Sequence, residues 1–206
     1  MLDIFDTEMN KIGTMSRKDV HLLGCWHQTF HCWVATKDKN GEYLLFQRRS
    51  PNKRTFPNLF DISAAGHLIA GESVRDGVRE VHEELGLNIN FVDLNPLFVH
   101  ILSDASQEVV NNEFCHVYLY IAPYSSMKFN VQLEEVSGLY HVKIDEMYEL
   151  INNKVDLVKA EGTDFKENGF RVKSALFLSK GDFVPNGDEY YTKVLEKAKQ
   201  FLRLLE

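Results

Sequence analysis

Residues 66–87 constrain this chain more than any other segment, because they join a glycine loop to a short run with helical spacing. Glycines stand at positions 66 and 71, ahead of the helical run. At about 100° per residue, Glu80, Glu83 and Glu84 project from one stripe of a helix. The apolar residues lie on nearly the opposite side, at Val74, Val78, Val81 and Leu85. The pattern predicts a loop and then a helix that is anchored through its apolar side and presents three acids outward.

Three carboxylates on one stripe repel one another, so an ordinary solvated helix face would carry lysines between them. A divalent cation removes this repulsion. Mg²⁺ and Mn²⁺ prefer oxygen ligands, and Mg²⁺ usually binds few protein carboxylates directly, leaving its other positions to water and substrate phosphate. The acids therefore predict a Mg²⁺ site, with Mn²⁺ as the other candidate ion, that serves phosphate chemistry.

The same residues match a known signature, the Nudix box. It consists of a glycine, five residues, a glutamate, seven residues, Arg-Glu, an aliphatic, any residue, Glu-Glu, any residue, a glycine and an aliphatic. The positions are filled in order by Gly66, Glu72, Arg79, Glu80, Val81, Glu83, Glu84, Gly86 and Leu87. The segment thus resembles the Nudix hydrolase superfamily. The resemblance implies an α/β (α+β) Nudix fold, in which a mixed β-sheet is sandwiched between helices.

The spacing departs from the signature in one place. Only six residues separate Glu72 from Arg79, where the signature has seven. In a helix the missing residue would rotate Glu72 by about 100°, which works against the contact that family members make between these two side chains. Ser73 would absorb the change as an N-cap with Asp76 as its capping-box partner. We therefore expect Glu72 to lie in the loop before the helix.

A narrower resemblance covers residues 20–87 and 111–118. These segments are similar to the Nudix branch that includes type I isopentenyl-diphosphate isomerase. The positions that match the ligands of that enzyme are His27, His67 and Glu113 for a metal ion, and Arg49 and Lys53 for the diphosphate.

Two differences from the isomerase disfavour its activity. Ala65 stands where the isomerase has its cysteine nucleophile, and Asn111 replaces the first glutamate of its Glu-x-Glu metal pair. Without the thiol, proton transfer to and from an alkene lacks a principal acid/base group.

The predicted site combines the motif with this resemblance. The metal ligands are expected among Gly66, Glu80, Glu83 and Glu84. The catalytic residues are expected among Arg79, Glu80, Glu84 and Glu113, with Arg79 orienting Glu83. The general base stays open between Glu84, Glu80 and Glu113. The residues expected to bind the substrate are Gly66, Arg49 and Lys53. The side chains of Arg49 and Lys53 are expected to neutralise the distal phosphate. His21, His31 and His116 are expected to be core or surface residues, and Cys115 buried packing.

The rest of the sequence is expected to supply the sheet and its helices. After a short N-terminal strand or hairpin, strands are predicted at about 27–35, 43–47, 60–65, 97–102 and 114–122, with a polar loop at 103–112. A short helix is predicted from Asp145 to about Ile151. A final amphipathic helix is predicted from Tyr191, Val194, Leu195, Ala198, Phe201, Leu202 and Leu205. Residues 155–183 have no clear pattern.

Composition limits the class of protein. With 206 residues, 44% of them hydrophobic and 26% charged, the chain is typical of one domain plus an extension. We expect residues 1–165 to form a Nudix hydrolase domain and 166–206 a C-terminal extension whose last helix packs on the same domain. The net charge of −7 argues against nucleic acid as a partner. No apolar run reaches membrane-spanning length, and the three cysteines are scattered. A cytoplasmic monomer or homodimer is expected.

The function predicted from these features is Mg²⁺-dependent hydrolysis of a diphosphate linkage in a small organic diphosphate, by attack of water at phosphorus. Two alternatives are an isopentenyl-diphosphate isomerase-like enzyme and a non-catalytic Nudix ligand-binding module. The substrate stays open between nucleoside diphosphate derivatives, dinucleotides and isoprenyl diphosphates.

Overall fold

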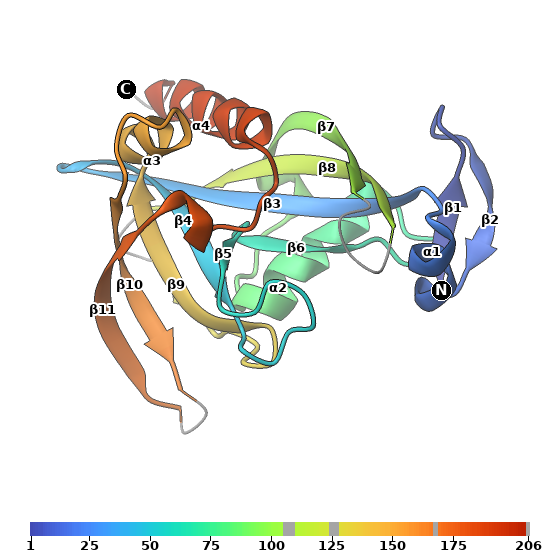
Figure 1. Cartoon of the computed structure of the whole chain (residues 1–206), viewed down its shortest axis with the longest axis horizontal. Coiled ribbons are helices and arrows are strands. Elements are labelled where there is room, and N and C mark those ends of the chain that lie inside the picture. The colour runs from blue at the N-terminus through green and yellow to red at the C-terminus, as the bar shows by residue number, and fades with distance from the viewer. Residues whose placement is uncertain (105–109, 124–127, 167–168, 205–206) are drawn as a thin grey trace.

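A computed structural model of the protein describes residues 1–104, 110–123, 128–166 and 169–204 (Figure 1). A small antiparallel sheet is formed by β1 (Leu2–Phe5) and β2 (Lys11–Met15). The main sheet contains β3 (His27–Asp38), β4 (Gly41–Arg49), β5 (Phe60–Asp61), β6 (Ala64–His67), β7 (Leu94–Asp104), β8 (Asn111–Ile121), β9 (Val136–Lys143), β10 (Val158–Phe165) and β11 (Arg171–Leu178). The helices are α1 (Arg17–Leu23), α2 (Arg79–Leu85), α3 (Ile144–Ile151) and α4 (Asp188–Arg203), with 3₁₀ turns η1 (Val74–Val78), η2 (Phe91–Asp93) and η3 (Lys180–Asp182).

The main sheet is mixed. Its strands run in the order β11-β10-β9-β4-β3-β8-β7, with β5 paired to β4 and β6 paired to β3. The pairing of β3 with β8 is parallel, and the other pairings are antiparallel.

Two hydrophobic cores cover the two faces of this sheet, because successive residues of β3 point to opposite sides. Phe30 and Cys32 belong to the core that contains Val81 and Leu85 of α2. Trp33 belongs to the core that contains residues of α3 and α4. In Figure 1, α3 and α4 lie on one side of the sheet and α2 on the other. The predicted mixed sheet between helices is thus confirmed.

Several elements differ from those expected. Neither α1 nor β9 was predicted, and residues 155–183, which have no clear sequence pattern, contain the hairpin of β10 and β11. The strand predicted at 60–65 is two short strands. The polar loop predicted at 103–112 lies partly outside the described residues, and β7 and β8 extend into both of its ends.

The final helix, α4, packs against α3 and against strands of the main sheet. Leu205, which was assigned to the stripe of this helix, lies outside the described residues. Position 165 ends β10, so the domain division at 165/166 would separate β10 from its partner β11. The division into two parts stays a prediction. Among the described helices, none has the length and apolar content to cross a membrane.

Candidate active site and metal centre

The motif helix begins with a 3₁₀ segment. Asp76 Oδ2 accepts hydrogen bonds from the backbone N and the Oγ of Ser73, at 2.8 and 2.7 Å, which confirms the predicted capping pair. The five residues of η1 precede α2, which starts at Arg79. A 3₁₀ helix advances about 20° further per residue than an α-helix, so five residues add about 100°, the rotation of one α-helical residue. The 3₁₀ segment thereby offsets the residue that the motif lacks.

Arg79 consequently reaches Glu72 in spite of the short spacer. Its Nε lies 2.7 Å from Glu72 Oε1, and its Nη2 lies 3.1 Å from Glu72 Oε2. The same guanidinium donates to Glu80 Oε1 at 2.7 Å, to Glu83 Oε2 at 3.2 Å and to the backbone carbonyl of His67 at 2.9 Å. Hydrogen bonding to Glu72 is the main cause that raises the pKa of Arg79. Arg79 therefore organises three acids of the motif, and not Glu83 alone.

Glu80 lies directly against Gly66. A Cβ at position 66 would stand 2.1 Å from the Cδ and Oε1 of Glu80, so only glycine leaves room for the carboxylate. Burial raises the pKa of Glu80, although the charge of Arg79 acts in the opposite direction. Position 66 is thus a glycine because a carboxylate fills the place of its side chain.

Glu84 points into the protein. Only 6% of its surface is exposed, and its Oε2 accepts from the backbone N of Ala65 at 3.1 Å and from Gln47 Nε2 at 3.2 Å. Burial raises the pKa of Glu84 to about 8. Glu83, by contrast, is about half exposed, at 49% of its side chain. Within the described chain the oxygens of Glu80, Glu83 and Glu84 do not form one compact group of ligand atoms. Their joint role as metal ligands stays a prediction.

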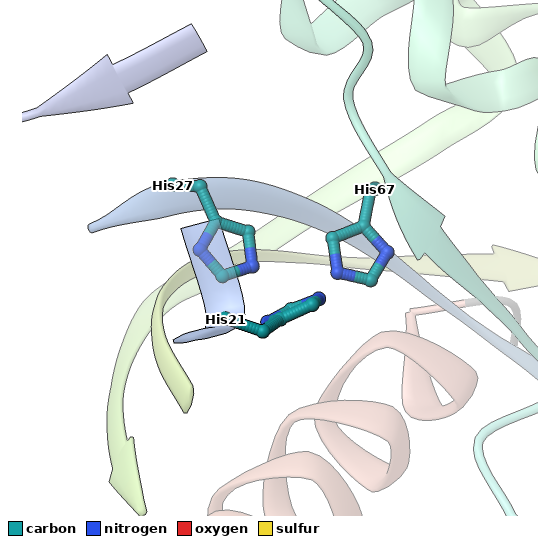
Figure 2. Close-up of side chains that lie close together, drawn as sticks. All are labelled: His21, His27 and His67. Atoms are coloured by element: carbon teal, nitrogen blue, oxygen red, sulfur yellow. The ribbon is translucent and has the colours of Figure 1, made fainter. Parts of the chain in front are cut away.

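A second cluster was only partly expected. His21 of α1, His27 of β3 and His67 of β6 bring ligand nitrogens within 4.8 Å of one another (Figure 2). Among the described residues, the buried Nδ1 of His21 and the buried Nε2 atoms of His27 and His67 have no hydrogen-bond partner. Burial lowers the pKa of His21, and that of His67 to about 3, so both rings are neutral near pH 7. His21, which was expected to be a core or surface residue, thus lies in a group of histidines that could hold a metal ion, and its role as a ligand stays a prediction.

The geometry of His27 suits metal binding. Its Nδ1 lies 3.0 Å from the backbone carbonyl of Cys25, which only accepts hydrogen bonds, so Nδ1 carries the proton. The Nε2 lone pair is then free to bind a cation, and Glu113 Oε1 lies 3.6 Å from it. Glu113 Oε1 is also 3.9 Å from His67 Nε2. Three imidazoles and one carboxylate are donors that suit Zn²⁺, Mn²⁺ or Fe²⁺ better than Mg²⁺.

Glu113 is buried and held by its neighbours. Its Oε1 accepts from Asn111 Nδ2 at 2.6 Å, and its Oε2 accepts from Thr29 Oγ1 at 3.4 Å. Burial alone would raise the pKa of Glu113, but interaction with His27 and the nearby His67 lowers it well below its ordinary value. The register of the sheet explains the meeting of these residues, since His27 pairs with Glu113 and Thr29 pairs with His67.

The two predicted phosphate ligands are engaged elsewhere. Arg49 Nη1 lies 2.7 Å from Asp61 Oδ2, and its Nε and Nη2 donate to the backbone carbonyl of Thr55. Lys53 pairs with Glu135. Their contact with a substrate stays a prediction.

Comparison with known proteins identifies the family of this chain. The family model of the NUDIX domain matches residues 16–160. The chain is 43% identical over 196 residues to an uncharacterized Nudix hydrolase of Clostridium acetobutylicum, with 94% of each chain covered. It is 36% identical over 122 residues to an isopentenyl-diphosphate Delta-isomerase of Brevibacterium linens, covering 58% of this chain and 65% of the relative. The crystal structure of DR0079 from Deinococcus radiodurans has a TM-score of 0.56 at 22% identity, covering 74% of this chain and 88% of that one.

The chain therefore belongs to the Nudix hydrolase family, as the motif predicts. Members of this family generally use divalent metal cations.

Proposed function

We propose that this protein hydrolyses the diphosphate linkage of a small organic diphosphate, with Mg²⁺ and by attack of water at phosphorus. The observation that carries the proposal is the burial of the Glu80 and Glu84 carboxyls side by side with the glycine loop. Both carboxyls have their pKa raised by burial, and they stand on one helix beside Gly66 and Ala65. Buried acids at such spacing are stabilised by a bound cation, and their oxygens are the donors that Mg²⁺ prefers.

The residues of the site have separable tasks in this proposal. Mg²⁺, when bound, would polarise the phosphoryl oxygen and lower the pKa of the attacking water. Glu80, Glu83 and Glu84 would hold the ion, and Arg79 would keep Glu80 and Glu83 oriented through its contacts with both. Gly66 leaves the space that the Glu80 carboxylate fills.

The general base stays open between Glu84, Glu80 and Glu113. Burial raises the pKa of Glu84 to about 8 and also raises that of Glu80, whereas the pKa of Glu113 is lowered by its interaction with His27 and His67. A cation held by Glu80 and Glu84 would lower the pKa of both carboxyls, so these shifts do not select the proton acceptor.

We also place a second divalent ion at the cluster of His21, His27, His67 and Glu113. The unpartnered buried nitrogens support this assignment, and so does the similarity to the isomerase relative, in which the matching positions of His27, His67 and Glu113 are metal ligands. Arg79 connects the two sites, because it donates to the His67 carbonyl and to Glu80. Arg49 and Lys53 would leave Asp61 and Glu135 to neutralise the distal phosphate.

The similarity to an isopentenyl-diphosphate Delta-isomerase makes isomerisation the second candidate. Ala65 and Asn111 oppose it, because they remove a thiol and a carboxylate from the positions at which that enzyme carries them. A ligand-binding module without activity is the third candidate.

The test is a panel of nucleoside diphosphate derivatives, dinucleotides and isoprenyl diphosphates, assayed at fixed Mg²⁺ by ³¹P NMR. We expect release of phosphate or a monophosphate from at least one compound, with solvent ¹⁸O incorporated into a phosphoryl product. The double variant Glu83→Gln/Glu84→Gln should lose turnover by about 10²-fold or more and keep its fold. Glu196→Gln, an exposed change on α4, is the control and should be fully active. Isomer interconversion without hydrolysis, or full activity of the double variant, would refute the proposal.

A further inference from the structure

A line of buried polar side chains runs from the C-terminal helix to Glu113. Trp33 Nε1 lies 3.1 Å from the Tyr190 hydroxyl, and that hydroxyl lies 2.9 Å from His31 Nδ1. Trp33, Tyr190 and His31 are exposed by only 0%, 1% and 7%. Buried polar groups cost stability unless they are hydrogen-bonded, and a fully apolar core would avoid that cost. Tyr190 also lies outside residues 16–160, which the family model matches.

The hydrogen bonds of this line have a defined direction. The indole Nε1 of Trp33 only donates, so the Tyr190 oxygen accepts from it. The single proton of the Tyr190 hydroxyl then needs an acceptor. Within the described part of the chain, the only other hydrogen-bond partner of that hydroxyl is His31 Nδ1. His31 Nδ1 therefore accepts, and the ring carries its proton on Nε2.

The line continues on the other side of His31. His31 Nε2 lies 3.4 Å from Thr29 Oγ1, and Thr29 Oγ1 lies 3.4 Å from Glu113 Oε2. With a proton on Nε2, His31 donates to Thr29, and the Thr29 hydroxyl is left to donate to Glu113. Both contacts are longer than ordinary hydrogen bonds, so each is weak. The Oε1 of Glu113 faces the nitrogens of His27 and His67.

We propose that Tyr190 and His31 are positioning residues of the active site: the Tyr190 hydroxyl fixes the Nε2–H tautomer of His31, which through Thr29 holds Glu113 with its Oε1 toward the three-histidine cluster. The role in turnover rests on the function proposed above. The tautomer itself does not, since it follows from the hydrogen bonds of the protein alone. The C-terminal helix then serves the site as well as the core.

The experiment begins with the metal-free protein labelled with ¹⁵N in histidine. Long-range ¹H–¹⁵N correlation distinguishes the two imidazole tautomers, and a His31→Gln variant identifies the His31 signals by their loss. We expect His31 in wild-type protein to be protonated on Nε2. Protonation on Nδ1 would overturn the proposal without any further variant, so the test stands even if a Tyr190 variant does not fold.

Tyr190→Phe removes the hydroxyl and keeps the ring. The Nδ1–H tautomer should then appear in the His31 signals, and kcat should fall by about tenfold or more with KM little changed, as is usual for residues that orient metal-site groups. Tyr191→Phe is the matched control. Its hydroxyl is also buried and donates to the Val184 carbonyl at 2.7 Å, but it has no hydrogen bond to His31. This control should leave the tautomer and kcat unchanged.

Thr29→Val breaks the line beyond His31, so kcat should fall while the His31 tautomer is retained. Equal effects of Tyr190→Phe and Tyr191→Phe on the tautomer or on kcat would overturn the positioning role. If wild-type protein hydrolyses none of the diphosphates in the panel, the proposed function fails, and the NMR result still decides whether Tyr190 sets the tautomer.

Discussion

Gly66→Ala separates catalysis from stability at this site. The added Cβ would stand 2.1 Å from the Glu80 carboxylate, whereas ordinary contact begins at 3.4 Å, so the carboxylate must move by 3.4 − 2.1 = 1.3 Å. The side chain of Glu80 is flexible, and its end can move without disturbing the backbone. A displacement of about 1 Å at a reacting group costs roughly 10²-fold in rate. We therefore expect kcat to fall by about 10²-fold in this variant.

The stability of the same variant should change little. Gly66 does not have a positive φ, so alanine fits its backbone. Alanine reduces the entropy of the unfolded chain, which stabilises the protein by about 0.4–1 kcal/mol. Loss of the Glu80 contact with Arg79 acts in the other direction, by about 1 kcal/mol, because Arg79 is partly exposed and keeps Glu72 and Glu83. The free energy of unfolding should then stay within about 1 kcal/mol of wild type.

Gly71→Ala is the control, and it should show the opposite result. A Cβ at position 71 meets no atom within 4 Å, but Gly71 has φ +88°, which alanine adopts only with strain. We expect a loss of about 1–2 kcal/mol with kcat close to wild type. Urea unfolding and steady-state hydrolysis of a substrate from the panel measure both quantities. A Gly66→Ala enzyme with normal kcat, or one that is destabilised far more than Gly71→Ala, would refute the reasoning.

Three further changes test the site. Burial raises the pKa of Glu84 from 4.5 to about 8. Between pH 4.5 and pH 8 the folded protein therefore keeps a proton on this carboxyl that the unfolded chain has lost. Stability of the metal-free protein should therefore fall from pH 7 to pH 8, and urea midpoints of Glu84→Gln should show less of this fall. Arg79→Lys should lower kcat about tenfold or more in the hydrolysis assay, because one ammonium does not replace a planar fork that joins several acids. Mn²⁺ or Zn²⁺ should raise the Tm of chelator-treated wild type, and His67→Ala should reduce that rise in a thermal scan.

Each of these changes has its own control. Added Mg²⁺ should weaken the pH dependence of wild-type stability, since a cation beside Glu84 favours the charged carboxylate. Arg75→Lys is the same substitution at an arginine whose Cζ lies 5.6 Å from the centre of the Phe91 ring. This variant should keep the wild-type rate of hydrolysis. His82→Ala removes a histidine of the motif helix that no described metal cluster includes, and should leave the metal-induced rise in Tm intact. If a control variant or condition changes as much as the tested one, the role assigned to Glu84, Arg79 or the histidine cluster in that test is refuted.

The motif helix was the part of the site that sequence could predict, because its information is local. Helical spacing identifies the buried face, and Val81 and Leu85 are indeed core residues. A serine and an aspartate three residues apart identify the start of the 3₁₀ turn. The rotation that restores the contact of Glu72 with Arg79 was not predictable, because five residues in a 3₁₀ helix and five in an α-helix have the same sequence pattern.

The histidine cluster could not be read from spacing. His21, His27 and His67 come from three elements, and they meet only through the pairing of β3 with β6 and the position of α1. Pairing registers are set by contacts between distant segments, which local patterns do not record. The same reason applies to β9, which lies between β4 and β10 and contains Gly138. Whether such a segment forms a strand depends on packing against the adjacent strands, which its own sequence does not record.

The main sheet divides beside Glu84 of α2. β3 pairs with β4 over residues 34–38 and with β6 over residues 29–32, so β4 and β6 diverge from a common partner. Ser63 lies where they part, since its Oγ accepts from the Val34 N at 2.9 Å and donates to the Leu45 carbonyl.

Glu84 fills this fork. Its Oε2 accepts from Gln47 of β4 and from the backbone N of Ala65 in β6, which no strand takes up on that side. A continuous ladder between β4 and β6 would occupy the Ala65 N–H and close the gap, and Glu84 would then be confined to one face. The break between β5 and β6, which departs from the single strand expected at 60–65, is therefore what allows one short helix to present a carboxylate between two strands.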